Sequence, residues 1–345
     1  FRDSLYAMLK RNTFLNIKFE NMLDTLGEMS RTDLYSYLKE WEQLTPLPFY
    51  SIGEPELTKV VNKGGEEFFV LKVLVSNNSD YDGIIQMNVL QNGWWYQPME
   101  DPRARKKVEI AAHTSKEFVS VWEEQIRDVE INTMVSGNLP YMIRQSIGNV
   151  KQERNKIVKD TIYTLPESSL EMPGEVIVDN EDSTLFVLST PAVVGLLPKW
   201  LDKVEDTSFK YSGISWWRAP LQWTATTNAK YYGKYIRSAY VIKSGDGSQT
   251  ATWKIPVPEA GQYELYYHVF KDDELRWNDR LQGEYHFRVA YDSEMEDAYI
   301  NLRKANEGWE QLGTYYFSAD TVRVVLTDEC KLRSVTADAV KIVKR

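Results

Sequence analysis

The chain has 345 residues, of which 43% are hydrophobic and 26% charged, close to an ordinary globular composition. This composition excludes wholesale disorder, a collagen-like chain and a disulfide-stapled miniprotein, and the length predicts two or three domains. The 41 basic and 50 acidic residues give a net charge of −9, which argues against a protein that tracks nucleic-acid phosphates. No apolar run is long enough to cross a bilayer, so we expect no membrane span.

Residues 1–50 are predicted to form a short helical segment. Between Phe19 and Leu26 the apolar residues recur with the i, i+3, i+4, i+7 spacing of one helix face. A further helix is expected over residues 30–41, and the prolines that follow it prevent its continuation.

From residue 51 the hydrophobic pattern changes to that of β-strands. Strand-like segments separated by turn residues lie at 67–78, 83–90, 107–112, 117–124 and 129–132. Several short strands without a long helix predict an Ig-like β-sandwich over residues 51–150. The charged and proline-bracketed stretch 151–173 either completes this domain or links it to the next, and we assign it as a linker.

The last region, residues 174–345, is again rich in predicted strands. They lie at 175–179, 250–257, 262–270, 284–291, 309–317, 321–327 and 338–343, with turn residues between them. This number of strands predicts a jelly-roll β-sandwich, although residues 186–235 show no clear period. The expected fold is therefore mainly β, with a short N-terminal helical segment, an Ig-like sandwich and a jelly roll.

The common catalytic motifs are absent from the sequence. There are only three histidines, no H-E-x-x-H, and no nucleophile elbow, P-loop or Rossmann fingerprint. His268 and His286 lie within predicted strands, where packed or surface side chains are expected. We predict a non-catalytic chain. The alternative is a polysaccharide-active enzyme that uses the acidic stretches at 179–182, 272–274 and 292–297, which we otherwise interpret as loop charges.

Aromatic residues make up 13% of the chain, which is expected of a β-rich protein and also of a protein that stacks on sugars. An exposed Trp or Tyr can stack on the apolar face of a sugar while polar groups around it bond the hydroxyls. Adjacent tryptophans on a regular strand point to opposite faces, so we expect one of each pair to be exposed or the backbone to be irregular. The candidate ligand-binding residues are Trp94, Trp95, Trp216, Trp217, Arg218 and Trp277. The alternative for each tryptophan is core packing.

The acidic segment 179–182 is also a candidate calcium site. Calcium prefers several carboxylate and carbonyl oxygens held by a loop, and Asp179, Glu181 and Asp182 could supply some of them. Asp338 could join them, because the first and last strands of a jelly roll are often neighbours. The alternative is a solvated turn. We expect no other cofactor.

Four stretches of the last region have the order and spacing of a known module: VIVDNED (176–182), TATWKIPVPEAGQYELYYHV (250–269), GWEQLGTYYFSADTVRVVLT (308–327) and TADAVKIV (336–343). They resemble the golvesin/xanthan-lyase-type carbohydrate-binding-like domain. The resemblance implies a jelly roll appended to a secreted enzyme, hence an extracellular, periplasmic or cell-surface location. Trp253, Trp309 and Asp338 match the scaffold of that domain, which implies packing and hydrogen bonding for them and not ligand contact.

The first half of the chain carries a second resemblance. The stretches SRTDLYSYLKEWEQLTPLPFY (30–50), EEFFVLKVLVSNNSDYDGIIQMNVL (66–90) and VEINTMVSGNLPYMI (129–143) are similar to the end of a gluzincin zinc aminopeptidase and its following β-domain. No active-site residue is carried over, because the zinc-binding stretch would lie upstream of Phe1.

Together the two resemblances imply the non-catalytic C-terminal region of a secreted metallopeptidase-like protein. Its last domain would bind a polysaccharide or a glycoprotein glycan through exposed aromatic side chains. The alternative is a structural module that packs on the catalytic domain of the parent protein and binds no glycan.

Overall fold

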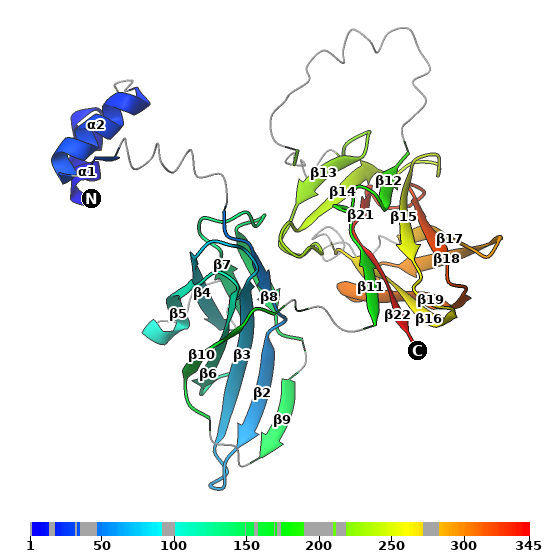
Figure 1. Cartoon of the computed structure of the whole chain (residues 1–345), viewed down its shortest axis with the longest axis horizontal. Coiled ribbons are helices and arrows are strands. Elements are labelled where there is room, and N and C mark those ends of the chain that lie inside the picture. Colours follow the sequence, from blue (N-terminus) through cyan, green and yellow to red (C-terminus); the bar gives the residue numbers. More distant parts are fainter. Residues whose placement is uncertain are drawn as a thin grey trace. The chain divides into compact units, whose positions relative to one another are not determined.

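The computed structural model describes residues 2–13, 18–31, 33–34, 47–91, 101–148, 150–154, 158–168, 170, 174–189, 210–211, 219–271 and 283–345. The chain divides into two compact units, Phe1–Leu47 and Pro48–Arg345. The fold is mainly β, as predicted, with helices only at the N-terminal end of the described chain (Figure 1). None of the described helices has the length and apolar character needed to span a membrane.

The first unit contains two helices, α1 (Arg2–Arg11) and α2 (Phe19–Ser30). Met8 on α1 and Leu23 and Leu26 on α2 are buried, which agrees with the predicted apolar face. Helix α2 ends at Arg31, whose left-handed backbone lets its N–H reach the carbonyls of the last turn. Of the further helix predicted over 30–41, most residues lie outside the described part.

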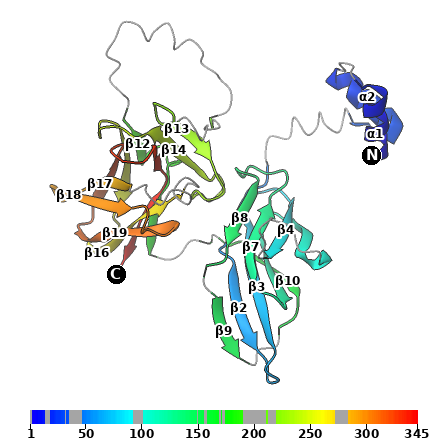
Figure 2. The ribbon, with the colours of Figure 1, turned by 180° about the vertical axis from the view of Figure 1, so that it is seen from behind.

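The second unit begins with a β-sandwich. Its strands are β1 (Tyr50–Ile52), β2 (Glu56–Val61), β3 (Glu67–Asn77), β4 (Gly83–Gln91), β5 (Arg105–Ile110), β6 (Thr114–Trp122), β7 (Ile126–Asn132), β8 (Met142–Ser146), β9 (Val150–Arg154) and β10 (Thr161–Pro166), with a 3₁₀ turn at Pro102–Ala104. One sheet has the order β10-β6-β3-β2-β9, with β1 also paired to β3, and the other has the order β5-β4-β7-β8 (Figure 2). Alternate side chains of the two sheets meet in one apolar core that includes Leu71, Phe118, Trp122, Ile85 and Val129.

The predicted linker, residues 151–173, proves to belong largely to this sandwich. Strand β9 pairs in parallel with β2, and β10 pairs antiparallel with β6, so each forms an edge of the same sheet. Most of their side chains are exposed. An edge strand that is solvated on both faces shows no alternation of apolar and polar residues, which is why its sequence resembles a linker.

The last domain is a jelly-roll-like β-sandwich. Its strands are β11 (Glu175–Val178), β12 (Phe186–Leu188), β13 (Thr224–Thr227), β14 (Ser238–Lys243), β15 (Thr250–Pro256), β16 (Gly261–Val269), β17 (Glu284–Tyr291), β18 (Glu294–Asn301), β19 (Gly308–Phe317), β20 (Thr321–Thr327), β21 (Ser334–Ala337) and β22 (Val340–Lys344). They form sheets of order β11-β22-β16-β19, β12-β15-β20-β17-β18 and β13-β14-β21 around one apolar core. The first strand, β11, pairs with the last, β22, as expected for this architecture.

The acidic stretch 292–297 is not only a loop, as was predicted, because residues 294–297 begin strand β18. This strand pairs along its whole length with β17 as a hairpin. Ala298 and Ile300, at alternate positions of this strand, are buried in the core. The acidic residues before them make this alternation hard to recognise in the sequence. The pairing with β17, not the local composition, therefore determines the structure of this segment.

Hydrogen bonds connect the sandwich to the jelly roll. The Leu139 N–H donates to the Tyr235 carbonyl at 3.1 Å, and the Arg237 N–H donates to the Leu139 carbonyl at 2.6 Å. The rings of Phe49 and Tyr235 also pack with their centroids 5.3 Å apart. Residues 228–237, which we call the bridging loop, thus join the two β-domains of this unit.

Candidate ligand-binding site

The aromatic candidates from the sequence cannot be placed. Trp94, Trp95, Trp216, Trp217, Arg218 and Trp277 all lie outside the described residues. They fall in three segments, 92–100, 212–218 and 272–282, of which the last connects β16 to β17 along the chain. Their role in ligand binding stays a prediction.

The acidic segment 179–182 forms a turn directly after β11. Asp182 Oδ2 accepts a hydrogen bond from the backbone N–H of Asp179 at 2.8 Å, which closes the turn. Glu181 forms an ion pair with Lys210, with 2.7 Å between Oε2 and Nζ, and accepts a hydrogen bond from the Ser238 hydroxyl. These contacts engage Glu181 and Asp182 within the protein itself.

Asp179 and Asp338 are close enough to influence each other. Burial, followed by the negative charge of Asp338, raises the pKa of the Asp179 carboxyl well above its usual range. Within the described ranges, however, no three His, Cys, Asp or Glu side chains are arranged to hold a metal ion. The predicted calcium site of Asp179, Glu181, Asp182 and Asp338 gains no support from this geometry and stays a prediction.

Asp338 organises a buried polar network below the bridging loop. Its carboxylate is fully buried, lies 2.8 Å from His268 Nδ1, and accepts the Tyr232 N–H at 3.2 Å. Its backbone carbonyl accepts a hydrogen bond from Trp253 Nε1, and Trp253 is itself fully buried. Burial lowers the pKa of Arg237 to about 10 despite the opposing charge of Asp338. Asp338 and Trp253 therefore have the packing and hydrogen-bonding roles that the sequence resemblance implied.

Trp309 is packed into an aromatic cluster on the outside of the same sheet. Its ring centroid lies 5.0 Å from that of Tyr232 and 5.1 Å from that of His268. The Lys341 ammonium lies 4.9 Å from the Trp309 ring centroid and forms an ion pair with Glu175 at 2.8 Å. These neighbours pack against the half-buried indole, which agrees with the packing role that the resemblance implied for Trp309.

An exposed aromatic platform lies instead on the β17–β18 hairpin. His286 of β17 and Tyr299 of β18 are directly paired in register, so their side chains lie on the same face of the sheet. Their rings are stacked with centroids 4.9 Å apart and an angle of only 9° between the planes. The Tyr299 side chain nevertheless remains 59% exposed, so the His286 ring supports one face of the tyrosine and leaves much of the residue open to solvent.

Two carboxylates hold the supporting imidazole in place. His286 Nε2 lies 2.8 Å from Asp297 Oδ1, and Nδ1 lies 3.3 Å from Glu329 Oε2. The His286 ring therefore cannot rotate without losing a polar contact. We call Tyr299, His286, Asp297 and Glu329 the tyrosine platform.

The edge position of β18 leaves the platform accessible. Strand β18 is the last strand of its sheet, so among the described residues no further strand lies beyond Tyr299. Asp297 and Asn301, two residues before and after Tyr299, share its face at roughly 7 Å spacings. Asn301 Nδ2 donates to Glu284 Oε1 at 3.1 Å. Polar groups thus lie on both sides of the ring, with more acidic than basic groups among them.

Sequence reasoning missed this platform. His286 was interpreted as a packed or surface side chain, and Tyr299 was not selected at all. The available signal was the alternating segment 284–291, which a two-residue turn at Asp292 and Ser293 joins to β18 as a hairpin. Only the pairing register shows that the two rings meet.

Solved structures with some likeness to this chain include carbohydrate-related proteins. A CBM35 module from Cellvibrio japonicus Abf62 shares 11% identity over 36% of this chain and 83% of that module, with a TM-score of 0.25. A β-glucuronidase of Bacteroides uniformis shares 12% identity over 84% of this chain and 30% of its own length, with a TM-score of 0.23. The Sulfolobus turreted icosahedral virus structure aligns with a TM-score of 0.18. We draw no conclusion from likenesses this weak.

Family comparison is informative for one part of the chain. No curated protein matches the chain. Residues 216–344, most of the jelly roll, match the family model of the Golvesin C-terminal domain, which agrees with the resemblance found in the sequence.

Proposed function

We propose that the jelly roll binds carbohydrate and that the tyrosine platform is a stacking site for a sugar ring. The observation that carries the proposal is the exposed Tyr299 ring, which a parallel His286 ring supports from behind. A ring fixed in this way loses little conformational freedom when the C–H face of a sugar stacks on it. The match of residues 216–344 to the Golvesin C-terminal domain supports a module of the carbohydrate-binding-like type.

The charges around the platform favour one class of sugar. Asp297 and Glu329 both lie at its edge, and Glu284 lies next to Asn301. Arg288, in register with Asp297, is the basic residue on this face, so the acids outnumber it. Carboxylates accept hydrogen bonds from hydroxyl and amino groups but repel other carboxylates. We therefore expect the platform to prefer neutral or amino sugars over uronates.

The test is a glycan array followed by titration calorimetry with the full chain. We expect Tyr299→Ala to weaken binding of the best glycan at least about ten-fold, because the stacking ring is removed. Tyr299→Phe should retain most of the affinity. The matched control is Tyr316→Ala, since Tyr316 is similarly exposed at 65% but lies on β19 in another sheet.

Each outcome has a definite meaning once melting temperatures show that the variants are folded. Binding that Tyr299→Ala leaves unchanged would overturn the platform and move the search to Trp216, Trp217, Arg218 and Trp277. A folded chain that binds no glycan would overturn carbohydrate binding altogether.

A structural role is the second candidate, and the contact between the two β-domains favours it. Asn138 donates to the Tyr50 carbonyl at 2.7 Å and to the Tyr235 carbonyl at 3.3 Å, so a single buried amide connects the sandwich with the bridging loop. A module whose task is to pack on its neighbours would use such contacts. The peptidase parent, the non-catalytic character and the extracellular, periplasmic or cell-surface location remain expectations from the sequence resemblance.

A further inference from the structure

The sandwich contains a second candidate site. It lies on the sheet face that packs into the core, beyond the part of that face whose side chains are buried. On β2, Leu57 is fully buried in the core, and Lys59 and Val61 follow on the same face. In register, Lys59 pairs with Phe69 and Gln152, and Val61 pairs with Glu67 and Arg154. The face that begins as apolar core therefore ends in polar side chains contributed by three adjacent strands.

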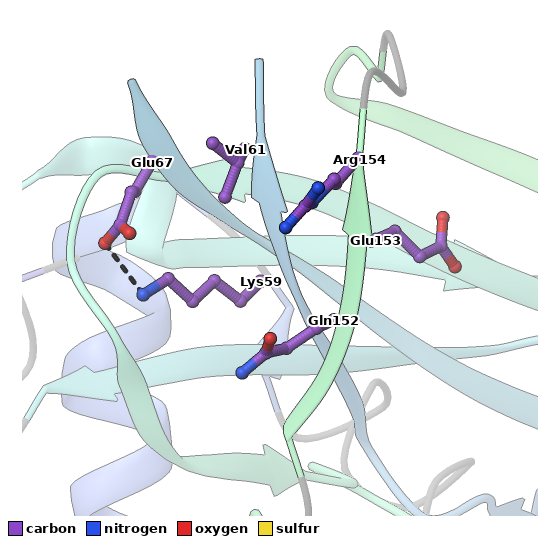
Figure 3. Close-up of a pocket in the computed structure, with 6 residues that line it drawn as sticks. All are labelled: Lys59, Val61, Glu67, Gln152, Glu153 and Arg154. Atoms are coloured by element: carbon purple, nitrogen blue, oxygen red, sulfur yellow. Dashed lines mark ion pairs between the residues drawn. The ribbon is translucent and has the colours of Figure 1, made fainter. Parts of the chain in front are cut away.

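These side chains line a pocket of about 400 Å³ (Figure 3). Lys59, Gln152 and Arg154 extend to the same side of the sheet, while the Glu153 carboxylate points away (Figure 3). A pocket of this volume is within the range that holds small-molecule ligands. Val61 supplies an apolar surface among the polar groups.

The two cations of the pocket differ in their partners. Lys59 Nζ is held 2.8 Å from Glu67 Oε2, so its charge is neutralised within the pocket. The Arg154 backbone pairs with β2, but its guanidinium has no hydrogen bond or ion pair with any residue in the described ranges, and the residue is exposed. A guanidinium presents two parallel N–H groups that match the two oxygens of a carboxylate. Arg154 is thus the group available to a ligand.

We propose that this pocket binds a small hydroxylated carboxylate, with Arg154 as the bidentate partner of its carboxylate group. The Gln152 amide and the Lys59–Glu67 pair supply donors and acceptors for hydroxyl groups, and Val61 packs against the carbon skeleton. Two kinds of ligand share this chemistry: a free sugar acid and a uronate unit of a longer glycan. The site is independent of the tyrosine platform, which lies in a different domain and has acidic surroundings.

The test is calorimetric titration of the full-length Tyr299→Ala chain, in which the platform has lost its stacking ring, with glucuronate, with open-chain gluconate and with neutral glucose. We expect glucuronate or gluconate to bind saturably and glucose to bind at least ten-fold more weakly. Arg154→Ala should weaken binding of the acid at least ten-fold, and Arg154→Lys should recover only part of it, because an ammonium cannot bind in the bidentate mode. Comparing the affinities for glucuronate and gluconate distinguishes a ring-shaped ligand from an open-chain ligand.

A matched control lies on the same strand. Lys151 on β9 pairs in register with Thr58, on the opposite face, and its ammonium is held 3.0 Å from Glu56. Lys151→Ala should leave the affinity for the acid unchanged. Three results would overturn the proposal. They are glucose affinity equal to that of the acids, equal weakening by Lys151→Ala and Arg154→Ala, and no saturable binding of either acid. A negative result in the test of the tyrosine platform would not overturn this proposal, because that test concerns other residues.

Discussion

At the scale of single residues, the buried carboxylate of Asp338 is expected to contribute strongly to stability. It faces His268 and the Tyr232 N–H and lies near the buried Arg237 guanidinium. Asp338→Ala would leave these groups buried without their anionic partner, so we expect a loss of about 3–5 kcal/mol in the free energy of unfolding. Urea denaturation measures this. Asp320→Ala, at an exposed carboxylate, should cost less than about 1 kcal/mol, and similar losses would contradict the role of Asp338.

His113 should make the stability of the sandwich depend on pH. Hydrogen bonds to Asp80 and then to Glu167 raise the pKa of its imidazole. The folded protein therefore binds this proton more tightly than the unfolded chain, and the stabilisation is full below the ordinary histidine pKa and lost as the pH rises through the raised value. Wild-type protein should show a urea midpoint that falls from pH 6 to pH 8.5. His113→Asn, whose side chain tolerates the positive φ of 51°, should flatten this dependence.

NMR titration of the His113 ring provides the independent check. An imidazole that titrates at or below its ordinary pKa, or a pH dependence equal in wild type and variant, would contradict this assignment.

At the scale of structural elements, the bridging loop depends on Gly233. Its φ is +149°, and a Cβ there would lie only 1.9 Å from the Ile236 carbonyl oxygen, a backbone atom that cannot simply rotate away. We expect Gly233→Ala to lower the free energy of unfolding by about 1–3 kcal/mol. Amide hydrogen exchange should also accelerate at Leu139 and Arg237, whose N–H groups form the bridge. Gly148→Ala, where a Cβ meets open space, is the control and should change neither quantity.

At the scale of the whole molecule, the two β-domains should unfold together. Asn138 is buried, and its amide hydrogen-bonds both to Tyr50 in the sandwich and to Tyr235 in the bridging loop. We expect one calorimetric transition for the two domains, which Asn138→Ala separates into two. Asn62→Ala, in a hairpin turn of the sandwich, should lower stability without separating the transitions. Two transitions in the wild-type protein would show that the domains are not coupled.

Much of the fold was predictable because strands with one buried face alternate apolar and polar residues in their own sequences. The alternation in 284–291 and 321–327 predicted β17 and β20 to the residue, since one face of each strand must be apolar to enter the core. Exposed edge strands do not show this alternation. Most side chains of β9, β10 and β18 are exposed, so their sequences lack regular alternation and resemble a linker or a loop.

The candidate sites were less predictable, because each is assembled across strands. The sequence could assign Asp338 and Trp253 to the scaffold through the resemblance to a known module. It could not show that His286 lies under Tyr299, or that Lys59, Gln152 and Arg154 line one pocket. Those pairings depend on strand register, which hairpin geometry and core packing determine together.

By itself, then, the sequence determined the fold class, the presence of two β-domains and the scaffold role of the buried residues. The fold class and the two β-domains follow from local periodicity and the burial of apolar side chains, whereas the scaffold role was implied by the resemblance to a known module. Only the tertiary structure decided where the sandwich ends, that the Tyr299 ring is supported and exposed, and which cation in the pocket lacks a side-chain partner among the described residues. These properties depend on contacts between residues distant in sequence, and no local pattern records such contacts.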